Sequence, residues 1–217
     1  MNKKQNRYIN KQEQLMNEQI KILRTNLTFN IDERENTIYM ITSSRQGEGK
    51  TTVSKQLVQS LADTDYKVLI IDADMRRPKI HKRFSFNNNY GLSNVISNQV
   101  TFDKALIYDE KTNVDVLTAG TMPPNPSELL DSKNFIDFLD HIKDIYDYII
   151  IDTPPILPVT DALVIGKLVD KTILVINSKA TPKDVVVEAK ERLDNLNIPI
   201  FGVVLNQVNK SKSNGYY

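Results

Sequence analysis

Short runs of apolar, largely β-branched residues recur along the chain, and polar segments with helical character separate them. Parallel strands that are buried on both faces show such near-continuous apolar runs, because helices cover the sheet on either side. The alternation therefore predicts an α/β fold with a doubly wound, mostly parallel sheet and helices on both faces. The runs that we interpret as strands cover residues 38–41, 67–71, 114–117, 148–151, 172–176 and 200–205, and the clearest helical segments are 51–61, 132–144, 161–169 and 182–196.

The N-terminal part of the chain predicts an amphipathic helix over about residues 11–29. Apolar residues recur there at steps of four, three and four, which is the spacing of one helix face. Charged residues follow three apart, where they form either a solvated face or one that pairs with neighbours within or between chains. The apolar residues are Met16, Ile20, Leu23 and Leu27, and the charged ones are Glu18, Lys21 and Arg24.

A glycine-containing turn lies between the first predicted strand and helix 51–61. It reads Gly47-Glu48-Gly49-Lys50-Thr51, and the order strand, turn, Gly-Lys-Thr, helix is that of a phosphate-binding loop. Backbone N–H groups can approach phosphate oxygens closely only where bulky side chains are absent, and the helix N-terminus adds positive charge. The usual motif has glycine at position 44, where this chain has Ser44. The alternative interpretation is an ordinary strand–turn–helix junction.

Aspartates directly follow two of the predicted strands. Asp72 and Asp74 follow strand 67–71 and share one face if the extended conformation continues. Two carboxylates on one face repel each other unless a cation or a proton-transfer role holds them there. Asp152 ends strand 148–151, an arrangement that steadies Mg²⁺ in P-loop NTPases. Either member of the first pair could instead cap a turn, but the three together favour a site for magnesium and phosphate.

Length and composition narrow the classes of protein. The chain has 217 residues, enough for one α/β domain, which we place at residues 1–208, with a flexible tail at 209–217. A net charge of +1 gives no basis for nucleic acid as a partner. The absence of cysteine excludes disulfides, thiolate catalysis and cysteine-ligated metals. No apolar run approaches the roughly 18 residues that span a bilayer, so we expect a cytoplasmic protein.

With these motifs in view, the chain resembles the bacterial tyrosine kinases of the capsule and exopolysaccharide type, in the cytoplasmic form of Gram-positive bacteria. The resemblance covers nearly the whole chain and is far more specific than the phosphate loop alone. It implies the P-loop fold of the ATPases that partition plasmids and place division septa. The segments that carry it are Ser43–Thr52, Asp72-Ala73-Asp74-Met75-Arg76, Arg77-Pro78 with His81, Pro123–Leu130, Asp152-Thr153-Pro154-Pro155 and the terminal Tyr216-Tyr217.

The resemblance also implies an activity and partners. It implies an ATP- and Mg²⁺-dependent kinase that phosphorylates its own Tyr216 and Tyr217 and regulates capsule or exopolysaccharide synthesis and export. Self-association into a ring would use Glu18, Lys21 and Arg24, with Lys21 in place of the first arginine of the family's Glu-x-x-Arg-x-x-Arg pattern. A membrane adaptor of the polysaccharide chain-length type would activate the kinase and recruit it to the inner face of the membrane. A cognate phosphotyrosine phosphatase would reverse the reaction.

Within that resemblance, the candidate catalytic residues take separate roles. Lys50 would bridge the β- and γ-phosphate oxygens. Thr51, Asp74 and Asp152 would hold Mg²⁺ directly or through water. Asp72 is the candidate base for the tyrosine hydroxyl, and Asp72 and Asp74 could exchange these roles.

Other residues would contact the nucleotide. Asn206 matches a position that reads adenine in this superfamily. Arg45 takes the place where partitioning ATPases carry a lysine that reaches into the partner's site, or else it is a solvated loop residue. The expected ATP contacts come from Arg45, Gln46, Gly47, Glu48, Gly49, Lys50, Thr51, Thr52 and Asn206.

Two other functions share most of these features. A partitioning-type ATPase would transfer the phosphoryl group to water and act through nucleotide-dependent dimerisation, with no use for Tyr216 and Tyr217. A nucleotide-gated scaffold would bind ATP with negligible turnover. Labelling with ATP separates the three, because only the kinase places phosphate on tyrosine.

Overall fold

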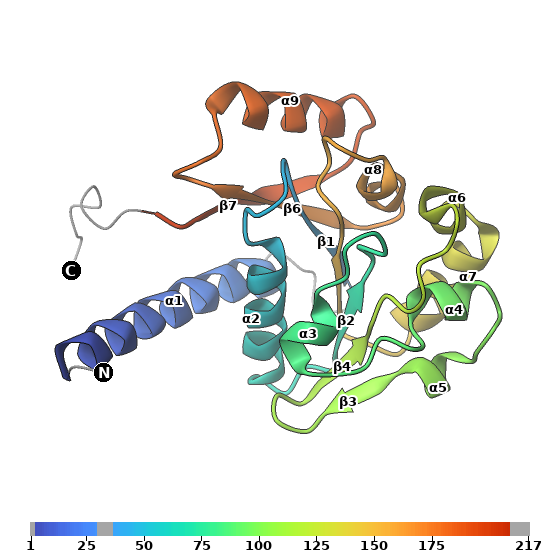
Figure 1. Cartoon of the computed structure of the whole chain (residues 1–217), viewed down its shortest axis with the longest axis horizontal. Helices are drawn as coiled ribbons and strands as arrows, with labels where there is room; N and C mark the ends of the chain where they lie inside the picture. Colours follow the sequence, from blue (N-terminus) through green and yellow to red (C-terminus); the bar gives the residue numbers. More distant parts are fainter. Residues whose placement is uncertain (1–2, 30–36, 209–217) are drawn as a thin grey trace.

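The structure, a computed structural model, describes residues 3–29 and 37–208, with side chains from residue 14 onward. Its centre is a seven-stranded sheet in the order β3-β4-β2-β5-β1-β6-β7 (Figure 1). Neighbouring strands run parallel, except that β3 pairs antiparallel with β4. The strands are β1 Thr37–Ser43, β2 Val68–Asp72, β3 Ile107–Asp109, β4 Val114–Leu117, β5 Tyr148–Asp152, β6 Lys171–Asn177 and β7 Ile200–Asn206.

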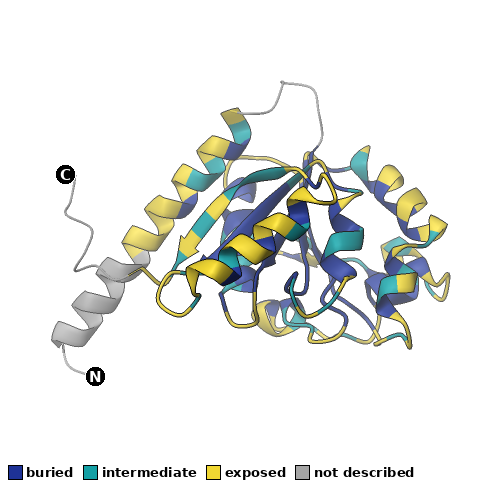
Figure 2. Cartoon of the chain, turned by 90° about the horizontal axis from the view of Figure 1, so that it is seen from above, coloured by how far each residue is buried: buried dark blue, intermediate teal, exposed yellow. Residues whose placement is uncertain are grey.

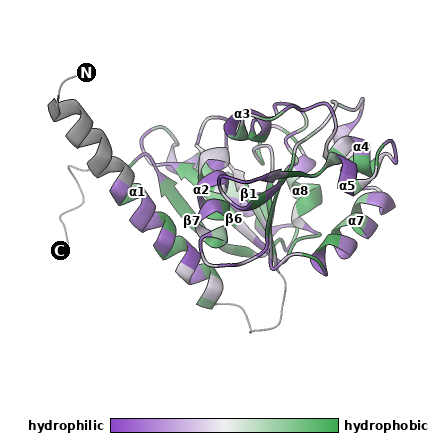
Figure 3. Ribbon diagram, turned by 90° about the horizontal axis from the view of Figure 1, so that it is seen from below, coloured by the Kyte–Doolittle hydropathy of each residue, from purple (hydrophilic) through white to green (hydrophobic). Residues whose placement is uncertain are grey.

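Helices cover both faces of the sheet. Successive strand residues point to opposite faces, so Ile150 packs with Leu57 of α2 on one face and Ile149 packs with Phe135 of α7 on the other. Figure 2 shows the strands at the buried centre, and Figure 3 shows the hydrophobic strands beside a largely hydrophilic α1. The first face carries α1 Lys3–Phe29, α2 Lys50–Ala62 and α3 Ile80–Phe84; the second carries α4 Leu92–Ile96, α5 Phe102–Ala105, α6 Pro126–Leu130, α7 Lys133–Lys143, α8 Asp161–Gly166 and α9 Lys183–Asp194.

The predicted architecture is confirmed, and the corrections concern particular elements. Each predicted strand is present with ends shifted by two residues at most. The first helix begins at Lys3 rather than residue 11. The apolar stripe indicated only the part of the helix that packs on the domain. The helix continues beyond the stripe because no glycine or proline interrupts residues 3–29. Strand β3 and helix α3 were not predicted, because each has five residues or fewer and little periodicity.

The topology gathers the predicted site residues at one edge. Strands β2, β5 and β1 are neighbours in the middle of the sheet, and their carboxyl ends lie together. Asp72 is in register with Asp152, which is also in register with Ile41 of β1. The loop that follows β1 therefore lies beside both aspartates. Ligands of open α/β sheets bind at such carboxyl ends.

Candidate active site

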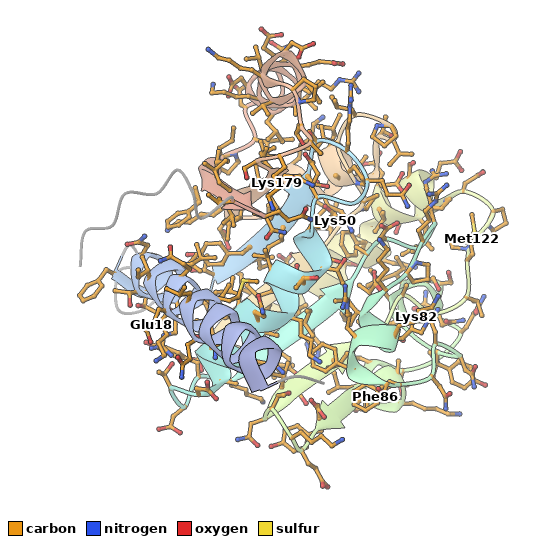
Figure 4. The ribbon with its side chains drawn as sticks, turned by 60° about the vertical axis from the view of Figure 1, so that its left-hand side comes forward. Glu18, Lys50, Lys82, Phe86, Met122 and Lys179 are labelled. Atoms are coloured by element: carbon orange, nitrogen blue, oxygen red, sulfur yellow. The ribbon has the colours of Figure 1, made fainter. Side chains whose placement is uncertain are left out.

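The loop between β1 and α2 has the conformation that its glycines allow. Gly47 and Gly49 have φ angles of 89° and 96°, in the left-handed region that residues with side chains rarely adopt. Gly49 caps α2, and a Cβ atom there would lie 2.0 Å from the side-chain nitrogen of Asn206. Both backbone and space therefore require glycine at position 49. The loop ends at Lys50, which Figure 4 labels at the start of α2 in the interior of the molecule.

A buried carboxylate holds this loop from the inside. Glu48 is 2% exposed, and its two carboxylate oxygens each accept from the Ser44 hydroxyl at 2.9 Å. The Arg45 backbone N–H donates to Glu48 at 2.8 Å, and the Thr181 hydroxyl donates as well. Ser44, which stands where the usual motif has glycine, thus supports the carboxylate with its hydroxyl. The Glu48 side chain is therefore committed to the loop, and Glu48 is absent from the lining of the adjacent cavity.

Lys50 and Thr51 lie against two aspartates at the bottom of the site. The Lys50 ammonium is 3.2 Å from Asp74 Oδ2 and 3.5 Å from Asp152 Oδ2. The Thr51 hydroxyl donates to Asp152 Oδ2 at 2.7 Å, and Ser54 donates to Asp152 Oδ1 at 3.0 Å. Lys50, Thr51, Asp74 and Asp152 thus form one connected group.

The charges in this group influence one another. Burial by itself would lower the pKa of Lys50, but the carboxylates of Asp152, Asp74 and Asp72 outweigh it and raise the pKa. Burial raises the pKa of Asp152, while the Lys50 charge and the Thr51 hydrogen bond oppose that rise. Lys50 is therefore a full positive charge at neutral pH, in a place where it faces carboxylates rather than water.

Asp72 is enclosed by backbone groups. Its oxygens accept from the N–H groups of Asp74 at 3.1 Å, Lys79 at 2.9 Å and Ile80 at 2.9 Å. Burial, followed by the charge of Asp152, raises the pKa of Asp72 to about 7, against the opposing hydrogen bonds from Ile80 and Lys79. The Asp72 side chain is fully buried and holds the turn that leads into α3.

A cavity of about 620 Å³ opens beside this group. The phosphate loop and first turn of α2 line it, together with Asp74, Pro154, Pro155 and Met16 of α1. Asp72 and Asp152, which have no exposed surface, lie behind the lining. A volume of this size suits a cofactor-sized ligand. The cations Arg76, Arg77, Lys79 and Arg83 also line the cavity and suit a polyanion such as a nucleoside triphosphate.

The remaining predicted nucleotide contacts divide into two groups. Asn206 lies at the cavity, where its side-chain nitrogen donates to the Glu48 carbonyl at 2.9 Å. Arg45 is exposed and outside the lining. The predicted residues that the structure brings to the cavity are Gln46, Gly47, Gly49, Lys50, Thr51, Thr52, Asp74 and Asn206.

The charged residues of α1 are only partly available for contacts between chains. Lys21 pairs with Glu18 at 2.9 Å, and both side chains are more than half exposed; Figure 4 labels Glu18 on α1. Arg24 instead donates to the backbone carbonyl of Ser60 on α2 at 2.6 Å. The predicted phosphate acceptors Tyr216 and Tyr217, with the whole tail 209–217, lie outside the described residues.

Several residues of the site were not predicted from the sequence, and three of them show why. Met16 lines the cavity. It could have been suspected because the apolar stripe of α1 extends beyond the residues that are buried against α2. Arg77 lines the cavity and donates to the Gln46 side chain; the signal was the density of basic residues over 76–83. Thr181 holds Glu48 from a distant loop, and nothing in the local sequence indicated that contact.

The oxygen donors of the site fit magnesium. Thr51, Asp74 and Asp152 supply hydroxyl and carboxylate oxygens, and the Lys50 ammonium lies between the two carboxylates, where positive charge is favourable. Within the described residues, no cluster of three or more His, Cys, Asp or Glu side chains could hold a metal. Mg²⁺ needs no such cluster, because one or two carboxylates, waters and substrate phosphates complete its octahedron. When bound, it would neutralise phosphate charge.

Comparison with known proteins shows the family of domains to which the chain belongs. Residues 36–186 match the family model described as an AAA domain. The fold is similar to the septum site-determining protein MinD of Pyrococcus horikoshii, with a TM-score of 0.68 and 24% identity over 81% of this chain and 72% of that one. This likeness concerns the fold alone. The chain therefore belongs to the AAA-domain family and has the predicted doubly wound P-loop fold.

Closer relatives identify the family within that class. The chain is 38% identical to tyrosine-protein kinase YwqD of Bacillus subtilis over 205 residues, which are 94% of this chain and 86% of that protein. The kinase domain of the Escherichia coli tyrosine kinase ETK matches with a TM-score of 0.87 and 39% identity, over 93% of this chain and 79% of that one. The full E. coli protein is longer, and the match covers 27% of it. The chain belongs to the bacterial tyrosine kinases.

Proposed function

We propose that the chain is an ATP- and Mg²⁺-dependent tyrosine autokinase that phosphorylates its C-terminal tyrosines and regulates capsule or exopolysaccharide synthesis and export. The observation that carries the proposal is the position of Lys50. Its ammonium lies at a nucleotide-sized cavity, beside Thr51 and two aspartates. This is the arrangement that phosphoryl transfer needs, and the chain's relatives are named as tyrosine kinases.

The residues would act mainly by positioning and by stabilising charge. Backbone N–H groups at Gly47, Gly49 and the start of α2 would bind phosphate oxygens, because the left-handed glycines open the loop toward the cavity. Lys50 would move from the carboxylates to the β- and γ-phosphate oxygens. Thr51 and Asp152 would hold Mg²⁺ directly or through water, with Asp74 beside them as the second carboxylate at Lys50.

Asp74 is better placed than Asp72 to accept the tyrosine proton. It lines the cavity, whereas the Asp72 carboxylate is enclosed by three backbone N–H groups. A base must reach the proton that it removes before its pKa matters. We therefore assign the base to Asp74, and to Asp72 the task of holding the turn on which Asp74 lies.

Replacement of Lys50 tests the kinase. Lys50→Met keeps most of the volume and removes the charge, so tyrosine labelling by γ-labelled ATP should fall by about 10² to 10³-fold. The matched control is Lys190→Met, which removes an exposed lysine that pairs with Asp194 on α9. Labelling that persists in Lys50→Met would show that the active site is elsewhere. Release of free phosphate without labelled tyrosine would favour the partitioning-type ATPase.

We place the phosphate acceptors at Tyr216 and Tyr217. They form an adjacent pair in the polar segment 209–217, which follows the single kinase unit that we propose at 1–208. The chain has nine tyrosines. Among those whose side chains the structure describes, Tyr39, Tyr146 and Tyr148 are buried, and the accessible competitors are Tyr66, Tyr90 and Tyr108.

A mixture of two variants shows whether transfer crosses between chains. The first variant is Lys50→Met with its tail intact, and the second is an active chain with Tyr216→Phe and Tyr217→Phe. We expect phosphate on the tail of the first. If that tail stays unlabelled while wild-type chains label themselves at a rate independent of concentration, transfer occurs within one chain.

The proposed partners follow from the family. We expect a membrane adaptor of the polysaccharide chain-length type, which would bring a cytoplasmic kinase to the inner face of the membrane. None of the helices in the described ranges is long and apolar enough to cross a membrane. We also propose a cognate phosphotyrosine phosphatase, and no role for nucleic acid.

Self-association is proposed to use the exposed Glu18–Lys21 pair, because Arg24 contacts its own chain. Glu18→Ala with Lys21→Ala should leave circular dichroism unchanged and lower the mass seen by light scattering. An unchanged mass would mean that Glu18 and Lys21 form a solvated face and no interface between chains.

A further inference from the structure

Arg76 lies two residues after Asp74 and is held by a distant carboxylate. Its Nε atom donates to Asp161 Oδ2 at 2.9 Å, and its Nη2 atom donates to Asp161 Oδ1 at 3.2 Å. Asp161 is the first residue of α8, and the two residues are separated by 85 positions in the sequence. Such a two-point contact fixes the plane of a guanidinium group, which a lysine in the same place could not do.

The carboxylate is itself fixed. Asp161 has no exposed surface, and its Oδ1 atom also accepts from the Ser127 hydroxyl of α6 at 2.6 Å. The Thr160 hydroxyl donates to Ser127 at 3.3 Å. Three elements therefore determine where Arg76 points: the turn after β2, helix α6 and the start of α8. A side chain that is supported in this way loses little conformational entropy when it binds a ligand.

One nitrogen of Arg76 remains available for a ligand. The contacts found in the described part of the chain use Nε and Nη2, and none uses Nη1. The side chain is 36% exposed and lines the same cavity as Lys50 and Thr51. The buried Asp161 thus holds one edge of the guanidinium group, while the side chain contributes to the wall of the proposed nucleotide site.

Arg76 adds a fixed cation to a site that must hold much negative charge. Three carboxylates, Asp72, Asp74 and Asp152, gather beside the single ammonium of Lys50, and a triphosphate adds further negative charge. In phosphoryl transfer, negative charge is spread over the oxygens of the transferred group, and an arginine that contacts them stabilises that charge. Arg76 lies two residues after Asp74 and lines the same cavity, so it belongs to the proposed transfer site.

We propose that Nη1 of Arg76 donates a hydrogen bond to the γ-phosphoryl group during transfer, and that Asp161 and Ser127 are positioning residues for it. The inference rests on the proposed function. As the bond between phosphorus and the ADP oxygen breaks, the bond to the tyrosine oxygen forms, and the tyrosine proton passes to Asp74. Arg76 stays protonated and exchanges no proton.

The test compares two arginine-to-lysine variants. Arg76→Lys keeps the charge and loses the fixed plane, so tyrosine labelling should fall by about 10²-fold, as for the loss of a charge-stabilising donor. The matched control is Arg192→Lys. Arg192 is a half-buried arginine on α9 that pairs with Glu188 and donates to the Leu157 carbonyl, outside the cavity. Its labelling rate should stay within about twofold of the wild type.

Nucleotide affinity separates this role from a purely structural one. Affinities for ADP and for the γ-imido analogue of ATP are measured by fluorescence displacement with Mg²⁺ present. In Arg76→Lys, affinity for ADP should be unchanged, while affinity for the analogue should fall by about tenfold, because Arg76 contacts the third phosphate alone. Asp161→Asn and the milder Ser127→Ala should shift the same ratio in the same direction.

Two results would overturn the inference. One is a labelling rate in Arg76→Lys equal to that of the wild type. The other is an equal loss of affinity for ADP and the analogue together with a lower melting temperature, which would make the Arg76–Asp161 pair a structural brace. If the wild type itself labels no tyrosine, the proposed function fails. The same comparison is then made on phosphate released to water, so the role of Arg76 is still decided.

Discussion

The glycines of the phosphate loop allow a sharp test of its geometry. Gly47 and Gly49 have similar positive φ angles, but a Cβ atom at Gly47 would meet nothing within 4 Å, whereas one at Gly49 would lie 2.0 Å from Asn206 Nδ2. Gly47→Ala should therefore cost the left-handed strain alone, about 1 kcal/mol of unfolding free energy. Gly49→Ala adds displacement of Asn206 and loss of its bond to the Glu48 carbonyl, about 1 kcal/mol more.

Urea unfolding of the nucleotide-free protein measures both costs, and Asn206→Ala completes the cycle. In the Asn206→Ala background, the cost of Gly49→Ala should fall to that of Gly47→Ala, because the clash is gone and the strain remains. Equal losses of unfolding free energy for the two alanine variants in the wild-type background would contradict a clash at Gly49. A Gly49→Ala cost that stays unchanged when the Asn206 side chain is removed would contradict it as well.

Three further predictions concern the loop, the first helix and the metal. Ser44→Ala removes the hydroxyl that holds the buried Glu48 carboxylate and should lower the unfolding free energy by roughly 1–3 kcal/mol in urea titrations. Leu27→Ala leaves a cavity at a fully buried position of α1 and should lower the unfolding free energy by about 2–5 kcal/mol. Leu15→Ala, at an exposed position of the same helix, should change it by less than about 0.5 kcal/mol. Chelation with EDTA should abolish tyrosine labelling, and added Mg²⁺ should restore it; labelling that survives chelation would exclude the proposed metal.

Much of the site was predictable because it depends on local sequence and strand order. The left-handed glycines, Lys50 and Thr51 follow from one contiguous motif. Asp72 and Asp152 end strands that a parallel sheet places side by side, so their proximity could be expected from the pattern of apolar runs. Short segments of sequence are therefore enough to predict the part of the site that lies at the ends of β1, β2 and β5.

The rest depended on contacts between distant segments. No local pattern distinguishes Glu48 as a residue that points inward, because its partners include Thr181 on a far loop. Arg24 was predicted to serve an interface, and only the packing of α1 on α2 reveals its contact with Ser60. Likewise, the relative accessibility of Asp72 and Asp74 is set by the backbone of α3, a helix too short to predict.

A map of the phosphorylated residues would show both whether the chain is a tyrosine kinase and which tyrosines accept phosphate. Wild-type protein is incubated with ATP and Mg²⁺, digested, and analysed by mass spectrometry, with Lys50→Met as the control. We predict phosphate on Tyr216 or Tyr217 in the wild type and none in the control. Phosphate found mainly on Tyr66, Tyr90 or Tyr108 would contradict the assignment of the tail as acceptor. Hydrolysis of ATP with no phosphotyrosine at all would contradict the kinase itself.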